Sequence, residues 1–222
     1  MKHLAIIMDG NGRYALSRGL TREEGHLAGA EAFASLVRDF ASLPIDVITV
    51  YAFSTENANR EKKEVDSLLE IIRSFLEKRI FSIAQNHHIS VKFIGNTTVL
   101  PTVLQDTMHR APFFKEGKTM IIALNYGGAD EVARAVRKMI DRNEQVSVER
   151  IKDYLDTAGY PDPDVLIRYG GYQRLSNFMP LQTAYTDLFF LDKLWPEYDV
   201  NDILDILADS AKIKRNFGVK HD

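Results

Sequence analysis

The chain contains no cysteine and no long run of apolar residues. Without cysteine it cannot form a disulfide framework, a thiol nucleophile or a cysteine-ligated zinc site. No apolar segment approaches the roughly 20 residues that a membrane-spanning helix needs, and the first apolar run, at 4–8, is too short for a signal peptide. We therefore expect a protein without a transmembrane segment that works in the cytoplasm.

An excess of charge of either sign is also missing. The 28 basic and 31 acidic side chains leave a formal net charge of −3, so overall charge gives no reason to expect nucleic acid or an anionic membrane as a partner. An anionic ligand would have to be held by a local basic site. The 222 residues, 45% of them hydrophobic, suffice for one continuous core. Because no segment is low in complexity or repeated, we expect a single domain over 1–222.

Short apolar runs rich in β-branched residues alternate with longer segments of helical period. The runs lie at 4–8, 47–53, 90–94, 120–124 and 165–167, and the helical patterns at roughly 27–42, 64–86, 99–109, 129–142 and 147–157. This alternation predicts an α/β fold with a parallel sheet covered by helices on both faces. Ligands of such sheets bind beyond the carboxyl ends of the strands, so the residues after each run are the first candidates for chemistry.

The segment after the first run combines a carboxylate, two glycines and an arginine, in the order Asp9-Gly10-Asn11-Gly12-Arg13. Glycines let backbone N–H groups approach an anion closely, and a carboxylate beside such a phosphate site usually means a divalent cation between them. Taken alone, the segment fits a plain turn equally well. Its glycine spacing matches neither a Walker A loop nor a dinucleotide fingerprint.

Two further segments carry polar side chains near predicted strand or helix ends. His26 opens a predicted helix with Arg22 just before it, and the free N–H groups of a helix start favour an anion. A lone histidine at such a place is more often structural. Ser54, Asn57 and Arg60 follow the second run and are candidates for substrate binding, although Ser54 or Asn57 fits a helix cap equally well.

The segment after the last run is the most informative. Arg168 and Arg174 lie six residues apart around a Gly-Gly turn, and Ser176 follows closely. Guanidinium groups bind phosphate oxygens through two parallel hydrogen bonds. The segment therefore predicts a second anion site, with surface salt bridges as the alternative.

Six motifs follow one another along the chain: Ile-Met-Asp-Gly-Asn-Gly-Arg (7–13), Gly-His-x-Ala-Gly (25–29), Tyr-Ala-Phe-Ser-Thr-Glu-Asn (51–57), Asn-Tyr-Gly-Gly (125–128), Arg-x-Gly-Gly-x-Gln-Arg-x-Ser-Asn-Phe (168–178) and Leu-Trp-Pro (194–196). In this order they resemble the cis-prenyltransferase (undecaprenyl diphosphate synthase-like) family. They are collinear with the family over nearly the whole chain. The resemblance implies a parallel α/β sheet with a hydrophobic cleft or tunnel, a homodimer, and Mg²⁺ as cofactor.

The resemblance also assigns roles to residues. Asp9 would hold Mg²⁺ against an allylic diphosphate, and Asp187 stands where the family has a second, metal-associated glutamate. Asp9, His26 and Asn57 are the predicted catalytic residues. The predicted diphosphate-binding residues are Gly10, Asn11, Gly12, Arg13, Arg22, Ser54 and Arg60, with Arg168, Arg174 and Ser176 for the second substrate.

Departures from the family pattern gather in the half of the site that would bind the second substrate, the acceptor. Tyr169 and Tyr172 replace a threonine and a glutamate, Ala58 replaces a tryptophan, and Asn216 replaces a tail arginine. Two aromatic rings there would shield a tertiary cation. We therefore expect an irregular, lavandulyl-type condensation that uses dimethylallyl diphosphate as both donor and acceptor, with isopentenyl or geranyl diphosphate as further candidate substrates.

Two alternatives stay open. The first is a regular synthase that elongates a cis-prenyl chain with isopentenyl diphosphate, and the second is a non-catalytic partner subunit, against which the retained Asp9 and Arg168 argue. A long product needs a deep tunnel. The bulk of Phe75 would plug one, although an apolar helix face at 64–86 is also typical of ordinary core.

Overall fold

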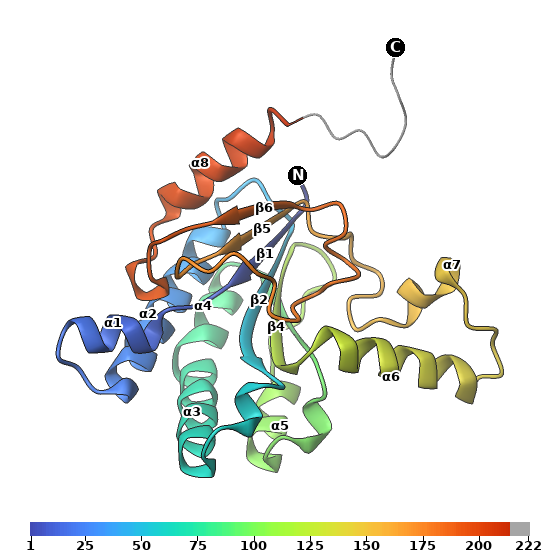
Figure 1. Cartoon of the computed structure of the whole chain (residues 1–222), viewed down its shortest axis with the longest axis horizontal. Helices are drawn as coiled ribbons and strands as arrows, with labels where there is room; N and C mark the ends of the chain where they lie inside the picture. The colour runs from blue at the N-terminus through green and yellow to red at the C-terminus, as the bar shows by residue number, and fades with distance from the viewer. Residues whose placement is uncertain (214–222) are drawn as a thin grey trace.

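A six-stranded parallel sheet forms the centre of the computed structural model, which describes residues 1–213 (Figure 1). Each pair of neighbouring strands runs parallel in the order β3-β4-β2-β1-β5-β6, so the predicted parallel α/β sheet is confirmed. The strands are β1 (His3–Ile7), β2 (Val47–Ser54), β3 (Ile89–Ile94), β4 (Lys118–Tyr126), β5 (Val165–Arg168) and β6 (Asp187–Phe190).

Helices lie in the crossovers between these strands, and one more, α8, follows the last strand. They are α1 (Asn11–Ser17), α2 (Arg22–Phe40), α3 (Lys62–Phe75), α4 (Phe81–Asn86), α5 (Thr102–His109), α6 (Gly128–Asp141), α7 (Val148–Ile151) and α8 (Val200–Ser210). A π-helical turn, Leu76–Ile80, joins α3 to α4. Among the described helices, none is both long and apolar enough to cross a membrane.

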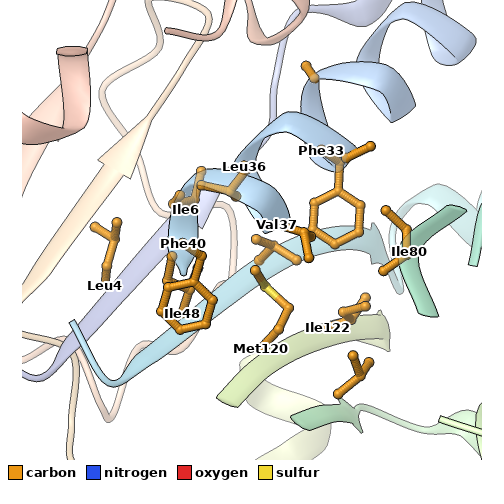
Figure 2. Close-up of a cluster of buried hydrophobic side chains, with 14 of the residues drawn as sticks. Leu4, Ile6, Phe33, Leu36, Val37, Phe40, Ile48, Ile80, Met120 and Ile122 are labelled. Carbon is orange, nitrogen blue, oxygen red and sulfur yellow. The ribbon is translucent and has the colours of Figure 1, made fainter. Parts of the chain in front are cut away.

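Alternate side chains of the strands feed two cores on opposite faces of the sheet. The larger core packs Ile6, Ile48 and Ile122 against α2 and the α3–α4 region. Figure 2 shows α2 laying Phe33 and Phe40 over this face. The other core packs strand residues such as Ala5, Ile7, Tyr51 and Leu166 against Phe178 and Met179. Burial on both faces explains why the central strands read as short, nearly continuous apolar runs.

The strand order reverses direction at β1, which lies between β2 and β5. The chain runs from β1 through α2 to β2 on one side, whereas β4 leads through α6 to β5 on the other side. Ligands of open α/β sheets bind in the crevice at such a reversal, outside the carboxyl ends of the strands. Asp9 and Arg168 stand at the carboxyl ends of β1 and β5.

Sequence patterns did not predict β6, α1 and the 11-residue α8, of which only β6 and α1 are half-exposed or short. The strand β6 leaves Leu188 42% exposed at the sheet edge, so it lacks the apolar run of a buried strand. The seven-residue α1 is too short to display a helical period. The predicted helix at 27–42 begins earlier, at Arg22, because Thr21 and Glu24 form a capping box. The departure at Asn216 lies outside the described residues.

Candidate active site

Asp9 lies between two arginines at the mouth of a large cavity. Arg168 Nη2 donates to Asp9 Oδ2 at 2.9 Å, and Arg13 Nη2 donates to Asp9 Oδ1 at 3.3 Å. The Arg168 side chain is only 5% exposed, whereas the Asp9 side chain keeps 30% of its surface open. The arrangement leaves the carboxylate accessible to a ligand while its orientation is held from two sides.

Two glycines make this close packing possible. Gly10 has a φ of 116°, and a Cβ there would lie about 2.9 Å from the Leu194 side chain. Gly170 has a φ of 93°, and a Cβ there would lie 2.5 Å from the Arg13 guanidinium, which donates to the Gly170 carbonyl. Backbone in this left-handed region favours glycine. Gly170 therefore allows the loops after β1 and β5 to meet, and Gly10 allows Leu194, which follows β6, to approach the same loop.

Trp195 connects the loop that carries Asp9 to α2 through two hydrogen bonds. Its backbone N–H donates to the Asp9 carbonyl at 2.9 Å, and its indole Nε1 donates to the Gly29 carbonyl at 2.8 Å. The ring is 1% exposed and lines the cavity. The Leu-Trp-Pro motif thus positions the loop that carries Asp9.

His26 projects from α2 into the same cavity. Its Nε2 is buried and has no hydrogen-bond partner within residues 1–213. Burial lowers the pKa of His26 below its ordinary value, and the nearby Arg60 and Arg22 charges lower it further, while Glu64 opposes them. The imidazole is therefore neutral at neutral pH. Because α2 begins at Arg22, His26 is its fifth residue and does not open the helix as the sequence suggested.

Arg22 and Arg60 share one carboxylate across the mouth. Arg22 Nη1 donates to Glu64 Oε2 at 2.7 Å, and Arg60 Nη1 donates to Glu64 Oε1 at 3.0 Å. Sequence reasoning named the two arginines but missed Glu64. No helical i,i+4 pattern could have pointed to it, because Arg60 lies before α3 (Lys62–Phe75) in an extended conformation.

Ser54 and Asn57 line the cavity while holding each other. The Ser54 N–H donates to Asn57 Oδ1 and the Asn57 N–H donates to Ser54 Oγ, both at 3.1 Å. This reciprocal pair stabilises the turn after β2, as in the capping alternative. Because both residues also line the cavity, their predicted contact with a substrate stays a prediction.

The loop after β5 is organised around the Arg168 guanidinium. Arg168 Nη1 donates to Ser176 Oγ at 2.7 Å and to the Arg174 carbonyl, while the buried Nε has no partner among the described residues. Ser176 and Asn177 adopt φ values of 49° and 63°, a left-handed conformation that is uncommon for residues other than glycine. Such backbone strain clusters at functional sites.

The far end of the cavity is apolar. The whole cavity measures about 1230 Å³. Its apolar wall comes mainly from α2, α3 and the π-helical turn, through Phe33, Leu68, Ile71, Ile72, Phe75, Leu76 and Ile80. The π turn interrupts the predicted 64–86 helix at this wall, and such turns occur often at functional sites. The predicted hydrophobic cleft is thus a continuation of the charged mouth.

Two residues expected at the site lie elsewhere. Asp187 begins β6 beside Val165, at the amino end of the strands, and accepts a hydrogen bond from Ser210 Oγ at 2.6 Å. Within a single subunit, Asp187 therefore does not reach the metal site expected at Asp9. Tyr169 is 0% exposed and packs edge-on against Trp195 with ring centroids 5.2 Å apart, so its ring belongs to the core and not to the cavity.

The other predicted residues meet at one mouth. Besides Asp9, those that line the cavity are Gly10, Asn11, Gly12, Arg13, Arg22, His26, Ser54, Asn57, Arg60, Arg168, Arg174 and Ser176. Among the described residues, no group of three or more histidine, aspartate or glutamate side chains is placed to hold a metal ion. Asp9 is nevertheless suited to Mg²⁺, which is usually held by one or two carboxylates and completed by substrate phosphates and water.

Comparison with known proteins identifies the chain, with this fold and cavity, as a prenyl-transferring enzyme. A family profile described as putative undecaprenyl diphosphate synthase matches residues 7–218, and the chain belongs to that family. An isoprenyl transferase of Wolinella succinogenes is 41% identical over 98% of this chain and 96% of that protein. An isoprenyl transferase of Aquifex pyrophilus is 40% identical over 98% and 95%.

A solved structure gives the same result for the fold. Lavandulyl diphosphate synthase from Lavandula x intermedia, in complex with dimethylallyl diphosphate, superposes with a TM-score of 0.89 at 33% identity and covers 98% of both chains. The expected cis-prenyltransferase resemblance and the predicted enzyme class are therefore confirmed.

Proposed function

We propose that the chain elongates an allylic prenyl diphosphate with isopentenyl diphosphate. The observation that carries this proposal is the single cavity of about 1230 Å³, which joins an arginine-rich mouth to a long apolar wall. Such a shape suits two diphosphate groups at one end and a growing hydrocarbon chain at the other. Relatives named isoprenyl transferase at 37–41% identity support the same class.

In the first step, the allylic carbon–oxygen bond breaks and the diphosphate leaves with the electron pair. Arg13, Arg22 and His26 are the residues we assign to this diphosphate, because their cationic or hydrogen-bonding groups face the cavity beside Asp9. Preorganised donors aimed at developing negative charge are a major source of rate enhancement. Asp9 would hold Mg²⁺ with the substrate oxygens, and the chemistry that such an ion supplies is neutralisation of the leaving group.

In the second step, the acceptor alkene donates its electron pair to the allylic carbon, and a proton is lost from the acceptor. We assign the acceptor diphosphate to Arg168, Arg174 and Ser176 in the loop after β5. His26, whose Nε2 has no partner among the described residues, is our candidate for accepting this proton, and Asn57, which lines the same cavity, is our candidate for orienting the donor. The apolar wall excludes water, which would otherwise quench the cation.

A second candidate function is the irregular condensation of two dimethylallyl diphosphate molecules. Tyr172 at the mouth favours it, because its aromatic ring stands where the family has a carboxylate. The likeness to lavandulyl diphosphate synthase also supports it. Tyr169 no longer does, since its ring is buried. We rank this candidate second because isoprenyl transferases are more similar to the chain in sequence, at 37–41% identity, than lavandulyl diphosphate synthase is, at 33%.

Product analysis separates the candidates. The enzyme is incubated with Mg²⁺ and dimethylallyl diphosphate alone, and separately with geranyl plus isopentenyl diphosphate, and the products are identified by mass spectrometry. We expect turnover only when isopentenyl diphosphate is present. A branched C10 product from dimethylallyl diphosphate alone would favour the irregular candidate. A non-catalytic subunit would release no diphosphate in either mixture. Homodimer formation stays a prediction, which sedimentation tests.

A further inference from the structure

The ring of Tyr172 lies among three guanidinium groups at the cavity mouth. The guanidinium carbons of Arg174, Arg13 and Arg168 are 4.1, 4.7 and 5.7 Å from the ring centroid. All three distances fall within the roughly 6 Å over which an aromatic ring attracts a cation. The Tyr172 side chain is 42% exposed, so it is not part of the packed core.

The three arginines differ in what else holds them. Arg13 and Arg168 both donate to the Asp9 carboxylate. The Arg174 side chain makes no hydrogen bond or ion pair within residues 1–213, and the Tyr172 ring is its closest partner. The three guanidinium groups that surround the ring carry like charges, which repel each other. The ring therefore provides attraction that keeps Arg174 next to the other two guanidinium groups.

We propose that Tyr172 is a positioning residue for the second diphosphate. Its ring holds the Arg174 guanidinium at the mouth, so that the second diphosphate meets two positioned cations, Arg168 and Arg174, instead of Arg168 and a mobile arginine. A preorganised site costs less conformational entropy when the ligand binds. The proposal rests on the proposed function only in assuming that two diphosphates bind, and it does not depend on which acceptor is used.

The probe is inorganic pyrophosphate, measured by isothermal titration with the full chain. We expect Tyr172→Leu to weaken the binding event that Arg174→Gln also weakens, by roughly tenfold. Tyr172→Phe keeps the ring and is expected to stay within about threefold of the unaltered chain. Tyr14→Leu is the matched control, because Tyr14 stacks on Arg18 at 3.9 Å outside the cavity lining.

A double-mutant cycle tests whether Tyr172 acts through Arg174. If it does, adding Tyr172→Leu to Arg174→Gln causes little further loss of pyrophosphate affinity. In turnover assays, Tyr172→Leu should raise the KM of the acceptor roughly tenfold with kcat nearly unchanged.

Three results would overturn the proposal: unchanged pyrophosphate binding in Tyr172→Leu, equal loss in Tyr172→Phe and Tyr172→Leu, or fully additive losses in the double variant. The binding measurements need no turnover. A failure of the proposed function, seen as the wrong products, would therefore leave the Tyr172 result readable, and a failure of the Tyr172 proposal would leave the product result unaffected.

Discussion

The two ends of the cavity hold their side chains in different ways. At the mouth, Asp9, Arg168 and Ser176 are fixed by directional hydrogen bonds, yet His26 Nε2 and Arg168 Nε remain without partners within residues 1–213. At the far end, Phe75 and its neighbours are held by packing alone. Under the proposed function, the mouth would bind the diphosphate groups through directional contacts, and the wall would limit the hydrocarbon chain by its volume. Substitutions at the mouth should change rates, and substitutions in the wall should change products.

The largest effect is expected at Asp9. Asp9→Ala should lower kcat by at least about 10²–10³-fold, since it removes the group that would hold Mg²⁺ against the leaving diphosphate. Steady-state rates at saturating Mg²⁺ measure the effect, and circular dichroism checks that the chain stays folded. Glu31→Ala is the control, because Glu31 is an exposed carboxylate paired with Arg79 outside the cavity. An Asp9→Ala variant with most of its activity would remove Asp9 from the mechanism.

A smaller effect is expected from Arg168→Lys, which keeps the charge but loses the planar fork. Lysine cannot reach Asp9, Ser176 and the Arg174 carbonyl in the geometry that Arg168 uses. We expect the acceptor KM to rise by about 10–100-fold, the equivalent of one or two hydrogen bonds to a charged group. The donor KM should change much less. Equal changes for both substrates would show that the two diphosphate sites are not divided as proposed.

The pH dependence tests the neutral state of His26. Burial and the Arg60 and Arg22 charges lower its pKa, so the neutral form is present at pH values above that lowered pKa and is lost as the pH falls through it. The acid limb of kcat/KM, which reports the free enzyme, should therefore lie below pH 6.5. His26→Gln should lose this limb. A limb that persists in His26→Gln would come from the substrate or another group.

The smallest effect on rate is expected in the wall. Phe75 and Ile71 line both the main cavity and a second cavity of about 400 Å³ between α2 and α3, so they separate the two. Phe75→Ala should lengthen the product by one or two five-carbon units while kcat changes less than about threefold, because the mouth is untouched. Mass spectrometry of the products measures the change. Phe113→Ala, at a side chain 82% exposed and outside the cavity, is the control.

Sequence patterns predicted the central strands and the residues of the mouth because both are marked by residues that are neighbours in the sequence. The buried strands appear as apolar runs, and the polar residues directly after them meet because parallel strands end at one edge. Contacts between distant segments were not predictable in this way. The position of Asp187 depends on the pairing of β6 with β5, and the burial of Tyr169 depends on Trp195, 26 residues further along the chain.

Glu64 and Tyr172 are also residues whose contacts the sequence did not predict. Their residue types were visible in the sequence, but their partners were set by the approach of α3 to α2 and of the loop after β5 to Arg13. Resemblance to a family supplied the roles of single residues. It did not predict where the side chains lie at positions that differ from the family, such as Tyr169 and Tyr172.

The central claim is that one mouth holds two prenyl diphosphates at separable positions. Titration with dimethylallyl thiodiphosphate, which resists ionisation, measures this directly in the presence of Mg²⁺. We predict two molecules bound per chain in the unaltered protein, a second molecule bound roughly tenfold more weakly in Arg174→Gln, and loss of the first molecule in Asp9→Ala. Binding of a single molecule to the unaltered chain, or equal weakening of one common site by both substitutions, would contradict the account.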